Sequence, residues 1–149
     1  DLSQEMLKAS EGLEVRLQTT PISLPFDSES FEFVTAVCVY HHVDFPDRGA
    51  LTRDVLRVIR PGGVFCVMEH NPLNPFTRRI VHRTPVDAKA ELLAPSGARR
   101  LVASAGFACL DTQFFLYLPE SAFRRMPRLE ALLRHLPLGG QYAVFAGKK

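Results

Sequence analysis

Two adjacent histidines, His41 and His42, stand directly after an apolar run, and a second polar group, Glu69, His70 and Asn71, follows another apolar run. Imidazole titrates near neutral pH, so a histidine here can take a proton from a hydroxyl or an amine. We predict His42, and next to it His41, as catalytic residues, with a pocket-wall role equally open. We predict that His70 and Asn71 bind substrate, although Asn-Pro also forms turns.

A basic cluster follows the second polar group. Arg78, together with Arg79 and Arg83, is predicted to bind an acidic group of a substrate. A solvated basic face is the alternative interpretation.

These residues must be positioned by strands and helices, which the hydrophobic pattern predicts. Strands are expected at 13–17, 31–40, 64–68, 108–118 and 141–146, helices at 3–12, 47–60, 96–105 and 122–135, and a loop at 71–85. Strands that alternate with helices indicate an α/β sheet with a parallel centre. Ligands of such sheets bind beyond the carboxyl ends of the strands, where the two polar groups lie.

Several sequence strings resemble class I S-adenosylmethionine-dependent methyltransferases of the small-molecule type. They are DLSQEML (1–7), LPFDSESFEFVTAVCVYHHV (24–43), VLRVIRPGGVFCVMEH (55–70) and LVASAGF (101–107). The resemblance implies one domain over residues 1–149 with a Rossmann-like α/β fold, a mostly parallel sheet and helices on both faces. It also implies methyl transfer from S-adenosylmethionine to a small-molecule acceptor.

The resemblance also assigns cofactor-binding positions. Asp1 matches the carboxylate that accepts hydrogen bonds from the cofactor ribose, and Leu2 follows it; a terminal acid near a helix N-terminus is the alternative. Thr20 stands where the family often has an aspartate for the adenine, with Pro21 beside it. Tyr40 and His41 match the segment that lines the cofactor.

The family's first two strands and its glycine-rich turn are expected to lie before Asp1. Without them, the strand at 31–40 has an open apolar edge, which predicts self-association or an unstable chain. Segments 71–93 and 119–140 are expected to shape the acceptor pocket.

Composition and motifs bear on the other functions and partners that the protein could have. The net charge is only +2, which does not favour nucleic acid, and no apolar run is long enough to span a membrane. Three scattered cysteines indicate reduced thiols in a cytoplasmic protein, and no metal site is expected. A non-catalytic, partner-binding remnant remains open. An NAD(P)-dependent oxidoreductase is disfavoured because the sequence has no Tyr-x-x-x-Lys pair.

Overall fold

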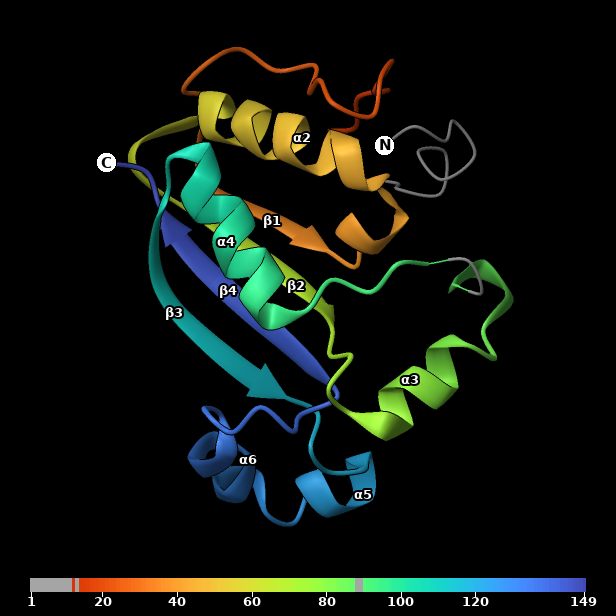
Figure 1. Ribbon diagram of the computed structural model, residues 1–149. Helices are drawn as coiled ribbons and strands as arrows, with labels where there is room; N and C mark the ends of the chain where they lie inside the picture. Colours follow the sequence, from red (N-terminus) through yellow and green to blue (C-terminus); the bar gives the residue numbers. More distant parts are fainter. Residues whose placement is uncertain (1–11, 13, 88–89) are drawn as a thin grey trace.

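A computed structural model describes residues 12, 14–87 and 90–149. Four strands form one sheet in the order β1-β2-β4-β3 (Figure 1). The strands are β1 (Phe31–Val37), β2 (Ile59–His70), β3 (Ala108–Phe115) and β4 (Gln141–Gly147). The helices are α2 (Phe45–Val58), α3 (Pro75–Val81), α4 (Pro95–Ala105), α5 (Glu120–Phe123) and α6 (Pro127–Leu133), with 3-10 turns at Tyr40–His42 and Pro85–Asp87.

The predicted α/β fold is confirmed, but the described sheet is mixed rather than mostly parallel. β1 and β2 are parallel, with Val37 opposite Met68. β4 is antiparallel to both β2 and β3. The physical reason is that the chain leaves β3 and returns through α5 and α6 at the same end of the sheet, which reverses the strand direction.

The hydrophobic core lies between the sheet and two helices. α2 and α4 pack side by side on one face of the sheet (Figure 1). Alternate residues of the strands point into this layer, because side chains of a strand alternate between the two faces. Its fully buried members include Tyr40, Ile59, Phe65, Tyr142 and Val144.

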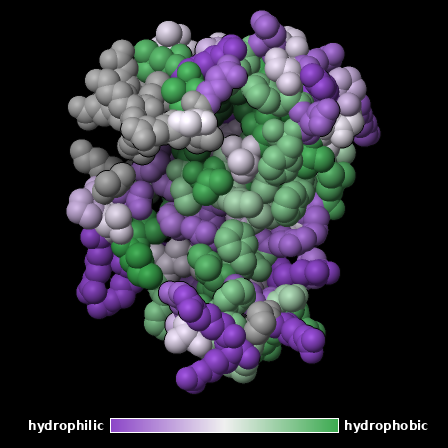
Figure 2. Space-filling view, turned by 180° about the vertical axis from the view of Figure 1, so that it is seen from behind, coloured by the Kyte–Doolittle hydropathy of each residue, from purple (hydrophilic) through white to green (hydrophobic). Residues whose placement is uncertain are grey.

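The opposite face of the sheet is more open in the described residues. Side chains of Phe33 and Val37 on β1 are 54% and 53% exposed, and Figure 2 shows hydrophobic residues gathered on this side of the molecule. Of the helices expected on both faces, the described helices α2 and α4 account for one face. β1 is the edge strand of the described sheet, as the sequence predicted.

The segment predicted as a loop at 71–85 contains helix α3. Asn74 caps its first turn, because the Asn74 side-chain oxygen accepts hydrogen bonds from the backbone N–H groups of Phe76 (2.9 Å) and Thr77 (3.1 Å). Pro75 at the first helical position has no N–H to satisfy. The same Asn-Pro pair that suggested a turn thus starts a helix.

Two other boundaries differ from the sequence pattern. Residues 14–18 form no strand, and Leu13 lies outside the described residues. Helix α2 ends at Val58, and Pro61-Gly62-Gly63 lies inside the first part of β2. There the pairing shifts from Phe31–Ile59 to Phe33–Val64, so the proline and glycines form an irregularity in the sheet.

Within the described part of the chain, the helices are too short or too polar to cross a lipid bilayer.

Candidate active site

A buried carboxylate, Glu69, organises the carboxyl end of the parallel strands. Glu69 is fully buried near the end of β2. One carboxylate oxygen accepts the backbone N–H of Tyr40 at 2.7 Å, and the other lies 2.5 Å from His41 Nδ1. Because β1 and β2 run parallel, the turn after β1 comes to lie beside Glu69. The carboxylate therefore fixes both the turn and the imidazole ring.

The environment of His41 favours its protonated form. Burial alone would lower the pKa of His41, but the hydrogen bond and charge of Glu69, with the charge of Asp87, outweigh it and raise the pKa. His41 Nε2 lies 3.5 Å from Asp87 Oδ1, and His42 Nε2 lies 3.4 Å from the same oxygen. The two imidazole rings are 4.2 Å apart between centroids.

A second group lies at the same end of the sheet, where the ring of His70 is 5.3 Å from that of His41 between centroids. His70 Nε2 lies 3.7 Å from Cys38 Sγ, and Gln141 Nε2 lies 3.8 Å from that sulfur and 3.4 Å from His70 Nδ1. Burial, with the charges of Glu69 and Asp87, raises the pKa of the Cys38 thiol to about 11. Burial, with the charge of His41, lowers the pKa of His70. At neutral pH this group is therefore a thiol beside a neutral imidazole.

Three cavities are lined in part by residues of the two groups. A cavity of about 670 Å³ runs along β1 and is lined by residues that include Pro21, Thr35, Cys38 and His42. A second, of about 480 Å³, lies beside α3 and is lined by residues that include His70, Phe76, Ile80, Tyr117 and Gln141. A third, of about 600 Å³, is lined by residues that include His41, His42, Asp44, Arg48 and Glu91.

The predicted cofactor residues have different positions. Pro21 lines the cavity along β1, whereas Thr20 is exposed and pairs with Ser23 through an isolated β-bridge. The Tyr40 hydroxyl is buried against the hydroxyl of Thr52 at 2.9 Å. Asp1 and Leu2 lie outside the described residues. All of these cofactor roles stay predictions.

The predicted substrate-binding residues also have different positions. His70 lines the 480 Å³ cavity, and Arg78 is exposed on α3. Asn71 is fully buried; its side-chain amide donates to the carbonyls of Gly139 (2.8 Å) and Pro137 (3.1 Å), and its oxygen accepts the N–H of Leu73. Asn71 thus joins the end of β2 to the segment before β4, while its substrate role stays a prediction.

Sequence reasoning did not single out Cys38, Asp87 or Gln141. Cys38 lies near the end of the strand predicted at 31–40, so its place close to a strand end was a usable signal. It adopts a left-handed conformation, with φ of 53°, which a non-glycine residue rarely takes. Asp87 and Gln141 reach the site only through the tertiary fold, and no local pattern marks them.

Comparison with known proteins points to one family. A sequence model of the "Methyltransferase domain" family matches residues 1–67. The fold is that of S-adenosylmethionine-dependent methyltransferases of known structure.

Solved structures of the same class share the fold at low sequence identity. A methyltransferase of Archaeoglobus fulgidus is 18% identical, with a TM-score of 0.73, over 99% of this chain and 74% of that one. A methyltransferase of Thermotoga maritima is 18% identical, with a TM-score of 0.74, over 99% and 70%. In a Haloferax volcanii complex of the Trm112 activator with a methyltransferase, the match is 17% identical, with a TM-score of 0.69, over 99% and 69%.

S-adenosylmethionine is the cofactor of this methyltransferase family, and the described residues fit it. The cavity along β1 has the size of a small-molecule site, and its walls combine apolar side chains such as Val37 with polar ones such as Thr35 and His42. Cys38, which follows β1, lines this cavity and has the left-handed backbone conformation given above. The bound cofactor supplies an electrophilic methyl group.

Proposed function

We propose that this methyltransferase transfers the methyl group to a small-molecule acceptor that binds in the cavity beside α3. One observation carries the proposal: a side chain that lines the cavity along β1 contacts a side chain that lines the cavity beside α3. Cys38 belongs to the first cavity, His70 and Gln141 belong to the second, and Cys38 Sγ lies 3.7 Å from His70 Nε2.

Such closeness is what methyl transfer requires. The reaction needs the donor sulfur, the methyl carbon and the acceptor atom in line at short distance, and an enzyme gains most of its rate from holding that alignment. The acceptor cavity suits a small molecule with an apolar body, since Phe76 and Ile80 line it, and with a polar end facing His70 and Gln141. Segments 71–93 and 119–140 would both contribute to it.

Two different roles are proposed for the histidines. His70 is held neutral, so it would orient the acceptor by a hydrogen bond. His42 lines the cavity along β1, and its side chain is 43% exposed, so it is the proposed proton acceptor, with Asp87 Oδ1 3.4 Å from its Nε2. His41 is the second candidate. Its ring is more buried and is held by Glu69.

The test has two stages that use the whole chain. Calorimetric titration with S-adenosylhomocysteine is expected to show saturable binding at one site per chain. A panel of small hydroxyl and amine compounds is then incubated with S-adenosylmethionine, and release of S-adenosylhomocysteine is measured. His70→Leu should keep cofactor binding and lose transfer, whereas the control Arg99→Gln, at an exposed position on α4, should keep both.

A non-catalytic binding role is the second candidate, because the apolar side chains of Phe33 and Val37 are exposed on β1, the edge strand of the described sheet. A folded chain that binds S-adenosylhomocysteine but methylates none of the panel, and that elutes as a dimer in gel filtration, would favour this role. The Haloferax volcanii neighbour, solved with the Trm112 activator, gives a precedent for a protein partner in this fold.

A further inference from the structure

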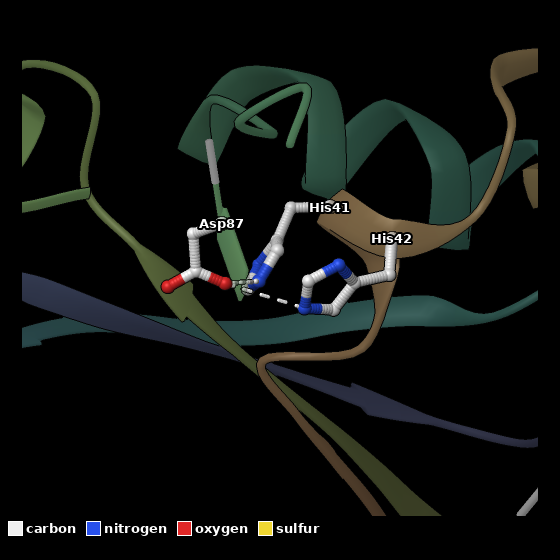
Figure 3. Close-up of side chains that lie close together, drawn as sticks. All are labelled: His41, His42 and Asp87. Atoms are coloured by element: carbon white, nitrogen blue, oxygen red, sulfur yellow. Dashed lines mark ion pairs between the residues drawn. The ribbon is translucent and has the colours of Figure 1, made fainter. Parts of the chain in front are cut away.

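Two imidazole nitrogens converge on one carboxylate oxygen beside the proposed active site. His41 Nε2 and His42 Nε2 lie 3.5 Å and 3.4 Å from Asp87 Oδ1. One ligand atom from each of the three residues lies within 4.8 Å of the others. Figure 3 shows both rings directed toward the Asp87 carboxylate, which comes from a turn far along the chain.

The distances suit a shared metal ion better than direct hydrogen bonds. Hydrogen bonds between nitrogen and oxygen are typically about 2.7–3.2 Å long. Bonds from zinc to imidazole nitrogen or carboxylate oxygen are about 2.0–2.2 Å, which places neighbouring ligand atoms of a tetrahedral site about 3.3–3.5 Å apart. Both separations from the Asp87 oxygen fall at this tetrahedral spacing.

The surroundings of His41 leave the correct nitrogen available. Its Nδ1 lies 2.5 Å from Glu69, so in the neutral ring that metal binding requires, Nδ1 carries the proton and Nε2 carries the lone pair. A ligating histidine whose other nitrogen donates to a carboxylate is the usual arrangement at metal sites, since it fixes the ring and makes it more basic. The other oxygen of Glu69 is held by the backbone N–H of Tyr40 at 2.7 Å.

Burial and access also fit an ion site. The side chains of His41, Asp87 and His42 are 1%, 15% and 43% exposed, so the cluster is buried on one side and open on the other. The open side faces the cavity of about 600 Å³, where water can complete the coordination. The negative charges of Asp87 and Glu69 would balance a divalent cation. Arg48, the nearby cation of that cavity, donates to the backbone carbonyls of Val43 and Glu91.

We propose that His41, His42 and Asp87 form a binding site for one divalent transition-metal ion of the zinc class. Two imidazoles and one carboxylate are a donor set that such ions accept, with at least one position left open. A bound ion would occupy the His42 lone pair, so ion binding and proton abstraction by His42 exclude each other.

The proposal is tested with zinc and cobalt on the whole chain, freed of any histidine tag. Calorimetric titration with Zn²⁺ should give one ion per chain, and Co²⁺ should give the visible absorption of a tetrahedral complex. His42→Gln and Asp87→Asn should each weaken zinc binding at least about tenfold. Lower pH should weaken it as well, because the ligand nitrogens must be deprotonated.

His82→Gln is the matched control, because this histidine lies outside the cluster, after α3. It should bind zinc as the wild type does. Far-ultraviolet circular dichroism confirms that each variant is folded. S-adenosylhomocysteine binding by Asp87→Asn, whose side chain is not in the wall of the cavity along β1, separates loss of the ion from loss of the proposed cofactor site. The proposal is overturned if the folded wild type binds no zinc at millimolar concentration, or if His42→Gln and Asp87→Asn bind it with unchanged affinity.

Discussion

Replacing Glu69 by glutamine tests whether the buried carboxylate holds the site together. The substitution keeps the size of the side chain but removes its charge and one of its two acceptors. In the wild type the carboxylate accepts from Tyr40 N–H at 2.7 Å and from His41 Nδ1 at 2.5 Å. A glutamine can accept only one of these hydrogen bonds, and its NH₂ group then faces the other donor.

The expected loss of stability follows from these contacts. A hydrogen bond to a charged group contributes about 1.5–3 kcal/mol, and an unsatisfied buried donor adds to the cost. We therefore expect Glu69→Gln to lower the free energy of unfolding by about 2–4 kcal/mol. In urea this corresponds to a midpoint lower by about 1–2 M, for a typical slope near 2 kcal/mol/M.

The loss should also depend on pH. Because the pKa of His41 is raised above its ordinary value of 6.5 in the folded chain, its pairing contributes stability that is fully present below pH 6.5. That contribution disappears as the pH rises through the folded pKa. The difference between wild type and Glu69→Gln should therefore be larger at pH 5.5 than at pH 9.

The assay is urea unfolding followed by circular dichroism at both pH values, with EDTA present to remove metal ions. Glu91→Gln is the matched control, because the Glu91 side chain is 74% exposed and lies 3.9 Å from Arg48. It should change stability by less than about 1 kcal/mol. The reasoning is refuted if the two variants are equally stable, or if the loss in Glu69→Gln grows with rising pH.

Three further results are expected. Tyr142→Phe removes a buried hydroxyl that donates to a backbone carbonyl at 2.7 Å, so thermal unfolding should show a loss of about 1 kcal/mol; an unchanged midpoint would contradict this. Because the Cys38 thiol pKa is raised to about 11, iodoacetamide at pH 8 should modify exposed Cys109 much faster than Cys38, measured by peptide mass spectrometry, and equal rates would be inconsistent with that pKa. Asn71→Ala should destabilise the fold by about 2–4 kcal/mol in urea unfolding, whereas Asn74→Ala, which removes only a helix cap, should cost about 1 kcal/mol. The reverse order would show that Asn71 does not connect β2 to the segment before β4.

Much of the fold could be predicted from the sequence, because strong local patterns mark it. The run 31–40 is apolar and β-branched, and it became β1 with the turn Tyr40–His42. Helix α4 begins at Pro95 and ends before Gly106, whose φ of 109° suits a glycine stop. By contrast, the strand direction of β4 depends on the route of the chain after β3, which no local pattern records.

The candidate site could be predicted only in part, for the same reason. His41, His42 and His70 were found because each follows an apolar strand, and parallel strands bring their carboxyl ends together. Glu69 was noted at the same edge, but its hydrogen-bond partners, Tyr40 and His41, could not be predicted. Asp87 meets the histidines through ion pairs across the fold, and sequence spacing carries no signal for such contacts.

The place of β4 in the sheet has a consequence for how the chain is made. β4 lies between β2 and β3, yet it is the last of the four strands along the chain. A ribosome releases residues in order, so β2 and β3 cannot be joined in one sheet until residues 141–147 have emerged. Until then the nascent chain carries unpaired edges on both strands, a state in which apolar edges are prone to aggregate. Assembly of the sheet is therefore expected to be completed only after β4 has left the ribosome.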